Sequence, residues 1–510
     1  MTSAMTPLWM HDRIAPAGTP FEPGARHDVV VVGAGLTGLS AALMLARDGR
    51  DVAVVDAGEV AARTSGANTG KLSLLQGDRL ALIARHHPAT LVQAYVEANR
   101  AGQDWLLTFA ESAGVPYTRA TDYAYAHEAA GVETLRAQHA AARDAGLDAR
   151  MLAAADLGPM PFPVAGAVAL DEQAMIDPVR VVDALARAFV AAGGTLHTGV
   201  RVTGVRARAE TCVHTPAGPL FARHIVLATG TPILDRGLYF AKVRGLRSSC
   251  VSFRLPAEAS PLAASYISVD GPTRSIRPVS AGDGPADAAQ LIVGGNGHAV
   301  GRADSEAAEL DDLVAWTREH FPGAEETHRW SAQDYESHNL VPFVGALPRG
   351  LGRIRFATGY AKWGLTNAPA AALRLATEIR GTRWRDRPRW MVTIGTRITV
   401  PADLGRGVAE NARVGGRLVG GWVDAAARRT PVARPAEGHG VVAQRGVCPV
   451  AVSTVDGVTR AVSAVCTHMG GVLEWNDAER TWDCPLHASR FAAEGTRIEG
   501  PAVRDLRRLR

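Results

Sequence analysis

The first strongly patterned part of the chain is a short apolar run, residues 29–32, that ends at a glycine. Consecutive apolar residues followed by a turn signal are typical of a strand that is buried on both faces. A helical pattern follows from Leu36 to about Asp48, and a second apolar run, residues 52–55, ends at Asp56. A strand–helix–strand unit of about 30 residues predicts the opening of a doubly wound, Rossmann-like α/β sheet.

Further along, the spacing of apolar residues predicts both helices and strands. Residues 85–150 have mostly helical spacing, and a proline opens a predicted helix at 178–192. The run 225–230 predicts a buried strand ending at a glycine turn, and 240–300 is rich in strand patterns. Two more helices are predicted, at 304–320 and 367–380.

The two ends of the chain differ from this pattern. Residues 1–27 are rich in Pro, Gly and Ala and are expected to be irregular. Residues 383–436 are rich in Arg, Gly and Pro, which is typical of a linker, so the large domain is predicted over 28–382. From 437 to 510, short strands with frequent glycines predict a small all-β domain.

Composition narrows the functional classes. A length of 510 residues favours two or three domains, and a net charge of +4 gives no electrostatic case for nucleic-acid binding. No segment approaches the roughly 18 consecutive apolar residues of a membrane span, and no secretory signal pattern opens the chain, so a cytoplasmic location is expected. Arginines crowd the C-terminal end, which fits a solvated tail or a docking patch for an acidic partner: Arg504, Arg507, Arg508 and Arg510.

A glycine-rich turn follows the first predicted strand. The segment Gly33-Ala34-Gly35-Leu36-Thr37-Gly38 fits G-x-G-x-x-G, and Asp56 ends the next strand. The glycines permit a tight turn and close approach of the backbone to a pyrophosphate, and the helix N-terminus favours negative charge. Because Asp56 suits free ribose hydroxyls, the motif predicts FAD or NAD rather than NADP.

A second glycine pair, Gly295 and Gly297, follows an apolar run but lacks a third glycine at the right spacing. We interpret it as a strand end with a turn. One nucleotide fold favours a tightly bound FAD that oxidises a small substrate directly, because a reductase fed by NADH usually needs a second such fold.

Four metal-ligating residues stand near the C-terminus. Cys466 and His468 form C-x-H, and Cys484 and His487 form C-x-x-H. Residues 472–475 and 481–483 between them predict a hairpin. Two Cys and two His suit a 2Fe–2S cluster in which histidines replace two thiolates on one iron, and they also suit tetrahedral zinc.

The surrounding residues favour the cluster. The segments C-T-H-M-G-G and T-W-D-C-P-x-H-x-S-R-F within 437–507 closely resemble Rieske proteins. Rieske proteins of respiratory complexes carry a disulfide at the positions of Gly471 and Leu486, and a Tyr at the position of Phe491. Ser489 remains as a hydrogen-bond donor. Fewer hydrogen bonds to sulfur imply a redox potential below that of the respiratory proteins.

The large domain resembles FAD-dependent oxidoreductases related to D-amino-acid oxidase and glycine oxidase. The resemblance rests on residues 28–56, 63–71, 225–230 and 357–367. It implies FAD-binding parts at about 28–80, 175–235 and 340–382, with α+β substrate-domain parts between them. The implied contacts beyond the glycine-rich turn and Asp56 are Thr64, Ser65, Asn68, Thr69, Gly70, Val200, Thr229, Gly230, Gly359, Gly364, Leu365 and Thr366.

The family pattern also shows a departure. Relatives that oxidise amino acids commonly clamp the substrate carboxylate with an Arg in a W-x-x-x-R arrangement, and Asp334 stands at that position after Trp330. Asp334 would meet an amine, orient a loop, or serve as an ordinary turn residue. Arg277 and Lys362 are alternative carboxylate anchors. The catalytic base stays open, with Tyr360, Lys362 and His338 as candidates.

Together the two sites predict an oxidoreductase. A small substrate, with a C–N bond in an amine or amino acid, would reduce FAD, and electrons would pass through the Rieske 2Fe–2S cluster to an external acceptor, with a protein as one option. The alternative is an electron-transfer component that delivers electrons to a partner oxygenase. A third option is a flavoprotein oxidase in which the Rieske domain is a structural remnant.

Overall fold

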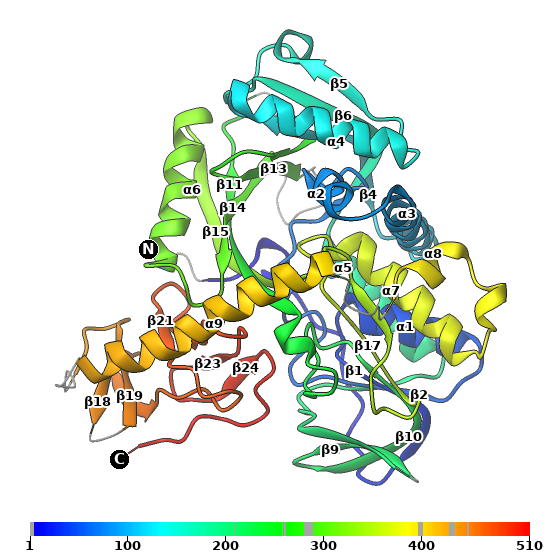
Figure 1. Cartoon of the computed structure of the whole chain (residues 1–510), viewed down its shortest axis with the longest axis vertical. Coiled ribbons are helices and arrows are strands. Elements are labelled where there is room, and N and C mark those ends of the chain that lie inside the picture. Colours follow the sequence, from blue (N-terminus) through cyan, green and yellow to red (C-terminus); the bar gives the residue numbers. More distant parts are fainter. Residues whose placement is uncertain are drawn as a thin grey trace.

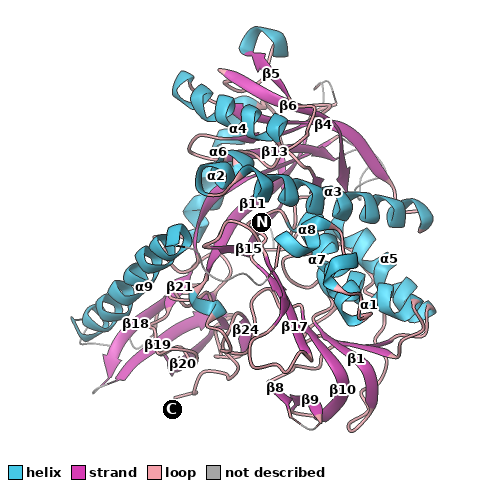
Figure 2. Cartoon of the chain, turned by 45° about the vertical axis from the view of Figure 1, so that its right-hand side comes forward, coloured by secondary structure: helices cyan, strands magenta, loops and turns pink. Residues whose placement is uncertain are grey.

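The computed structural model describes residues 5–208, 210–257, 259, 262–279, 289–395, 401–427, 434–445 and 448–509. Two large sheets form the body of the molecule, and the C-terminal strands form a separate small module beside them (Figures 1 and 2). Each large sheet carries helices, and the cores lie between helices and sheets.

The first sheet has the doubly wound form predicted from the sequence. Its main path is β16-β17-β10-β1-β2-β7, parallel from β17 to β7, with β16 antiparallel at one edge. Its strands are β1 (Arg26–Val32), β2 (Val52–Val55), β7 (Thr195–His197), β8 (Gly204–Ala207), β9 (Thr211–Thr215), β10 (Gly218–Leu227), β16 (Phe343–Ala346) and β17 (Ile354–Thr358). The apolar run in β1 is fully buried because helices and strands cover both faces of the sheet.

The second sheet has nine strands and is inserted into the first domain, with the main path β15-β11-β14-β13-β12-β4-β6-β3. Its strands are β3 (Lys71–Leu72), β4 (Tyr117–Ala126), β5 (Arg150–Ala153), β6 (Gly166–Ile176), β11 (Val243–Arg254), β12 (Ser265–Ser268), β13 (Arg274–Val279), β14 (Gln290–Ala299) and β15 (Glu325–Ser337). The prediction of strands across 240–300 is confirmed in the described residues.

One prediction about this region was incomplete and another was wrong. Within 85–150 the chain also forms β4, because pairing with β6 along most of its length outweighs the helical preference of an Ala-rich sequence. The glycines at 295 and 297 do not end a strand, since β14 continues to Ala299 and pairs with β11 past a bulge.

The helices before the C-terminal module include α1 (Leu36–Arg47), α2 (Arg79–His86), α3 (Ala89–Ser112), α4 (Val132–Asp144), α5 (Pro178–Ala191), α6 (Glu306–His320), α7 (Gly364–Ile379) and α8 (Arg389–Thr393). Helices α1, α5, α6 and α7 agree closely with the predicted ones, whereas α8 lies in the predicted irregular linker. Short 3-10 turns cover Leu8–Met10, Ala129–Gly131, Ala154–Leu157, Tyr239–Ala241 and Trp384–Asp386. At α5 the first residue is proline and Asp177 caps the backbone N–H of Val179 at 2.8 Å.

The expected irregular linker contains a long helix, so that prediction was wrong. Helix α9 (Pro401–Ala427) has 27 residues and runs along the C-terminal module (Figure 1). Its Val414, Leu418 and Ala425 pack on the core of that module, and this burial offsets the helix-weakening effect of its glycines. Residues 396–400 and 428–433 of the predicted linker lie outside the described residues. The domain boundaries themselves stay a prediction.

The C-terminal module consists of two small antiparallel sheets, as the glycine-rich strand pattern indicated. The strands are β18 (Gly440–Arg445), β19 (Cys448–Val455), β20 (Val458–Ser463), β21 (Glu474–Asn476), β22 (Thr481–Asp483), β23 (Arg490–Ala492) and β24 (Arg497–Glu499). The predicted hairpin is confirmed as β21 and β22. Across the described residues of the whole chain, no helix has both the length and the apolar run needed to cross a bilayer.

Candidate flavin and iron–sulfur sites

A cavity of roughly 320 Å³ lies where the two large sheets and the C-terminal module meet. Its wall includes Gly35 at the start of α1, Ser275 of the inserted sheet and Glu499 of the C-terminal module. A cavity shared by a doubly wound sheet and an inserted sheet can hold a nucleotide cofactor on one side and a substrate on the other.

The glycine-rich turn forms one end of the cavity. A Cβ at Gly33 would lie 2.4 Å from the Ala228 carbonyl oxygen, and one at Gly38 would lie 1.9 Å from the Gly33 oxygen, so both positions need glycine. The Asp56 carboxylate lines the cavity and accepts a hydrogen bond from the Ala34 N–H at 2.6 Å. Helix α1 has no side-chain cap from its own N-cap residue. A carboxylate and a helix N-terminus on one wall fit the ribose and pyrophosphate of a dinucleotide.

Most of the predicted flavin contacts line this cavity. Ser65 accepts a hydrogen bond from the Leu36 N–H at 3.0 Å, so the loop 63–71 lies against the start of α1. Helix α7 begins at Gly364 on the cavity wall without a side-chain cap, which leaves backbone donors for a bound anionic group. The predicted residues that line the cavity are Gly33, Gly35, Leu36, Thr37, Asp56, Thr64, Ser65, Asn68, Thr69, Thr229, Gly230, Gly364 and Leu365.

Six predicted contacts lie behind the cavity wall. The Val200 N–H donates to the Asp56 backbone carbonyl at 2.8 Å, and the neighbouring Arg201 lines the cavity instead. The Thr366 hydroxyl lies 2.6 Å from the Asn99 amide oxygen on α3 and so faces away from the cavity. The six residues are Ala34, Gly38, Gly70, Val200, Gly359 and Thr366.

Asp334, Lys362 and Tyr360 all line the cavity. Asp334 accepts backbone hydrogen bonds from Lys362 at 2.5 Å and from Tyr335 at 2.7 Å, so it orients the loop that follows β17. That loop needs support because Ala361 and Lys362 both have positive φ angles. Burial raises the pKa of Asp334 to about 6 and lowers the pKa of Lys362. The Tyr360 hydroxyl lies 3.0 Å from that of Thr37, and burial raises its pKa, which disfavours Tyr360 as a base.

The other two candidates lie outside the cavity, which corrects the sequence-based hypothesis. The Arg277 guanidinium donates to the carbonyls of Thr69 and Gly70, each at 3.0 Å, so it supports the 63–71 loop and cannot also clamp a substrate. His338 lies under α9, where its carbonyl accepts from Arg406 at 2.7 Å. Neither position was distinguishable from a site residue by spacing alone.

Sequence reasoning did not single out several cavity residues on the side of the inserted sheet, and Lys71, Ser248 and Cys250 are among them. Ser248 and Cys250 alternate on β11, and this period-two signal could have assigned them to one face. The buried Lys71 ammonium donates to the Tyr266 carbonyl at 3.2 Å, and burial lowers its pKa to about 8. Two lysines on the cavity wall, the buried Lys71 and the exposed Lys362, therefore provide positive charge where a substrate would lie.

The four metal-ligating residues come together on two loops of the C-terminal module. The His468 and His487 rings are 5.1 Å apart between centroids. A hydrogen bond with Cys484 lowers the pKa of the Cys466 thiol to about 7, which favours the thiolate that binds iron. Within the described residues, no group of three or more His, Cys, Asp or Glu side chains is arranged to bind a single metal ion. A 2Fe–2S cluster needs a different arrangement, with two protein ligands on each iron.

The residues present fit a Rieske cluster. The buried His487 Nδ1 has no hydrogen-bond partner in the described part of the chain, as expected for a nitrogen that binds metal. Backbone N–H groups approach both sulfurs, and the Ser489 hydroxyl reaches Cys466. A Cβ at Gly471 would lie 2.6 Å from a Leu486 methyl carbon, so the two positions that carry the disulfide in respiratory proteins are adjacent here. These residues would hold the cluster without that disulfide.

The first domain covers the two histidines. Phe240 lies edge-on to both rings, at 4.9 Å from His468 and 5.0 Å from His487. The His468 Nε2 lies 3.2 Å from an Asp235 carboxylate oxygen, and its side chain is 4% exposed. This contact occupies Nε2 and leaves Nδ1 for the metal, as at His487.

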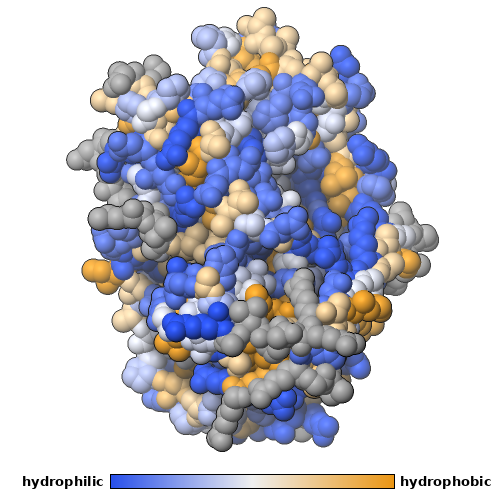
Figure 3. Space-filling view, turned by 90° about the vertical axis from the view of Figure 1, so that its left-hand side faces the viewer, coloured by the Kyte–Doolittle hydropathy of each residue, from blue (hydrophilic) through white to orange (hydrophobic). Residues whose placement is uncertain are grey.

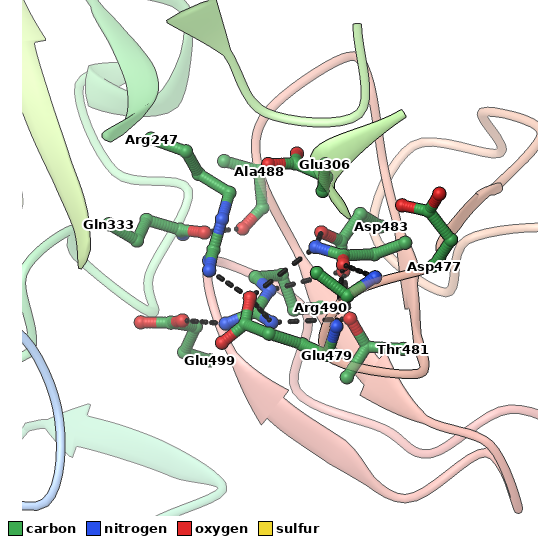
Figure 4. A network of polar contacts seen from close by, with 12 residues as sticks. Arg247, Glu306, Gln333, Asp477, Glu479, Thr481, Asp483, Ala488, Arg490 and Glu499 are labelled. Atoms are coloured by element: carbon green, nitrogen blue, oxygen red, sulfur yellow. Dashed lines mark hydrogen bonds and ion pairs between the residues drawn. The ribbon is translucent and has the colours of Figure 1, made fainter. Parts of the chain in front are cut away.

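A buried charge network holds the module in place (Figure 4). Arg490 forms ion pairs with Glu479 at 2.7 Å, Glu499 at 2.7 Å and Asp483 at 3.1 Å. Arg247 of β11 pairs with Glu479 from the other side of the interface. This arrangement of the two domains is favoured because separating them would part the buried Arg247 from Glu479.

The second cluster loop, residues 484–489, also contacts residues around the cavity. Gln333 of β15 donates to the Ala488 carbonyl at 2.9 Å and lies 3.0 Å from the Tyr335 hydroxyl. Tyr335 lines the cavity, and Ala488 follows the predicted ligand His487. A Cβ at Gly245 would lie 2.2 Å from that of Ala488, so only glycine admits this loop. The two sites are therefore joined by direct contacts within one chain.

Comparisons with known proteins agree with both sites. The family model described as FAD dependent oxidoreductase matches residues 28–378, and the model of the Rieske [2Fe-2S] domain matches residues 426–510. A Bacillus subtilis protein, YhfW, whose name describes a Rieske 2Fe-2S iron-sulfur protein, is 25% identical over 506 residues, covering 98% of this chain and 97% of YhfW. The cytochrome b6-f complex iron-sulfur subunit of a Synechococcus strain is 51% identical over 45 residues, 9% of this chain and 26% of that subunit.

Solved structures resemble the first domain. Glycine oxidase from Geobacillus kaustophilus has a TM-score of 0.59 at 19% identity, and it covers 73% of this chain and 100% of its own. L-Amino acid deaminase from Proteus myxofaciens has a TM-score of 0.59 at 16% identity, with 73% and 94% covered. At these identities the likeness shows a shared fold. The chain is an oxidoreductase that belongs to the FAD dependent oxidoreductase family and ends in a Rieske [2Fe-2S] domain.

Proposed function

We propose that this protein oxidises a small amine or amino acid at a C–N bond and passes the electrons to an external acceptor. A bound FAD accepts two electrons from a substrate, and a 2Fe–2S cluster carries one electron at a time. We also propose that the protein is located in the cytoplasm, as expected from the sequence.

The observation that carries the proposal is the contact between the two sites. Glu499 and Gly500 of the Rieske domain line the same cavity as Asp56 and the start of α7. Because Gln333 also joins the cavity wall to the cluster loop, electrons could pass between the sites without movement of either domain. An isolated remnant domain would not require such a buried and charge-matched interface.

The substrate part of the cavity favours an anionic substrate. Lys71 is buried on its wall and Lys362 is exposed on that wall, with Ser248 and Ser275 as additional polar groups. An ammonium attracts a carboxylate as a point charge, whereas the arginine of the family pattern would bind it in a bidentate way. We therefore propose that lysines replace the missing arginine as the anchor for a substrate carboxylate, and that Asp334 acts by orienting the Lys362 loop.

Anaerobic mixing with a panel of amines and amino acids tests this function. Flavin bleaching and cluster reduction would be followed together by absorbance. The proposal expects that at least one carboxylate-bearing amine reduces both groups. Reduction of the protein by none of these compounds, together with fast reduction by a partner reductase, would favour an electron-transfer component instead. Peroxide formation unchanged by loss of the cluster would favour a simple oxidase.

A further inference from the structure

We propose that an acidic one-electron carrier protein docks beside the first cluster loop, residues 466–471, and takes electrons from the reduced cluster. The docking surface consists of Met469 in that loop and of Val419, Trp422 and Val423 on α9. This inference rests on the proposed function, because it concerns how electrons leave the chain. In each transfer the cluster loses one electron and the carrier gains one, so two transfers complete one substrate oxidation.

The exposure of the two cluster loops indicates where electrons leave the cluster. Phe240 and Asp235 of the first domain cover the imidazoles of His468 and His487, so those rings face the chain's own interior. Among residues 466–471 and 484–489, all of which the structure describes, only Met469 is exposed, at 51%. A partner that approaches the cluster from solvent therefore meets Met469 first.

Helix α9 extends this exposed position into a surface. The Trp422 indole N–H donates to the Gly470 carbonyl at 3.1 Å, which places this part of α9 against the first cluster loop. Trp422 is 38% exposed, and its helical neighbours Val419 and Val423 are 65% and 60% exposed. Large apolar side chains in solvent beside a redox centre mark a contact site, since they gain burial when a partner binds.

Charge identifies the kind of partner. The Thr467 hydroxyl donates to the Arg504 carbonyl at 2.6 Å, so the arginine-rich end of the chain lies beside the cluster loop. Arg504, Arg507 and Arg508 are exposed, while Asp505 between them lies 3.5 Å from Arg497. Basic residues near an apolar contact site attract an acidic protein and speed its association.

The size of such a contact fits transient electron transfer. Weak redox complexes bury small areas and depend on charge for their rate of association. On the face of the molecule shown in Figure 3, apolar surface occurs as separate patches among hydrophilic residues, which is the distribution expected for small contacts.

The test uses two protein probes with the full-length protein that holds both cofactors. An acidic plastocyanin and a basic cytochrome c, each oxidised, would be titrated into the oxidised protein by calorimetry at low and high salt. The variants Val423→Glu and Arg504→Glu would be compared with Val408→Glu. Val408 has the same 60% exposure on the same helix, about 22 Å away along its axis, and it receives the same charge.

We expect plastocyanin to bind more tightly than cytochrome c, and salt to weaken its binding. Val423→Glu and Arg504→Glu should weaken it at least tenfold, and Val408→Glu by less than twofold. Electron transfer from dithionite-reduced protein to plastocyanin should slow in the same order, with cluster reduction by substrate unchanged. Equal losses in all three variants, tighter binding of cytochrome c, or no binding of plastocyanin would overturn the proposal. Failure of substrate to reduce the wild-type cluster would overturn the proposed function and leave this binding result intact.

Discussion

The side-chain amide of Gln333 donates a hydrogen bond to the main-chain carbonyl of Ala488 across the interface between the two domains, at 2.9 Å. Gln333 is buried in β15, and Ala488 directly follows the predicted cluster ligand His487. The bond therefore fixes the cluster loop against the strand that also carries Asp334 and Tyr335 into the flavin cavity.

Replacement of Gln333 by leucine should slow electron transfer from flavin to cluster several-fold. The substitution removes the hydrogen bond and leaves the buried Ala488 carbonyl unpaired, which costs about 1–3 kcal/mol and loosens the cluster loop. Anaerobic stopped-flow absorbance would measure the rate. Gln93→Leu, at an exposed position of α3, serves as the control. Equal rates in wild type and Gln333→Leu would contradict this role.

Replacement of Arg247 by leucine should weaken the domain interface. Glu479 keeps Arg490 as a partner, so we expect a loss in the free energy of unfolding of about 1–3 kcal/mol, below the loss for a fully isolated buried charge. Urea unfolding followed by cluster absorbance would measure it. Arg150→Leu breaks a half-exposed pair with Asp171 and should cost less than about 1 kcal/mol. A similar loss in both variants would show that the buried pair adds no more stability than the half-exposed pair.

Binding of carboxylates should weaken as pH rises through about 8. Burial holds the Lys71 pKa near that value in the folded protein, against 10.5 ordinarily, so Lys71 loses its charge over this range. The same shift means that folding disfavours the ammonium, so stability should rise between pH 8 and 10.5. Titration of benzoate, followed by the change in flavin absorbance, would measure the affinity. Lys71→Met should bind benzoate weakly at every pH, and an unchanged pH dependence in that variant would exclude Lys71 as the anchor.

A hydroxyl introduced by Phe491→Tyr should raise the midpoint potential of the cluster. Phe491 is fully buried in the same core cluster as Cys466, and a hydrogen bond to a ligand sulfur stabilises the reduced state. One bond of about 1 kcal/mol corresponds to about 40 mV for a one-electron couple. Redox titration of the cluster would measure the shift. Phe253→Tyr, buried in another core, should leave the potential unchanged, and a lower potential in Phe491→Tyr would contradict the role assigned to position 491.

Local patterns predicted the sites better than the fold that joins them. The glycine-rich turn, Asp56 and the four predicted cluster ligands carry their chemistry in fixed spacings, so a short segment suffices to predict them. Strand β4 and helix α9 escaped prediction because long-range pairing with β6 and packing on the Rieske core stabilise them. The contacts of Gln333, Asp235 and Phe240 with the cluster loops join residues more than 150 positions apart, and no local signal encodes them.

The roles of Arg277 and His338 show the same limit. Each residue type suits catalysis, but whether its side chain faces a cavity depends on the register of a strand and on the packing of a distant helix. Arg277 lies on β13 with its guanidinium against the 63–71 loop, and His338 is covered by α9. Conversely, Lys71 gains its significance from burial beside Cys250, which the sequence does not reveal.

The central claim is that flavin and cluster exchange electrons within one chain. It is tested most directly by anaerobic stopped-flow mixing of the protein with a reducing substrate at several protein concentrations. Flavin bleaching should be followed by cluster reduction with a first-order rate constant that does not depend on protein concentration. A cluster that stays oxidised while the flavin is bleached, or a rate that rises in proportion to protein concentration, would contradict the claim.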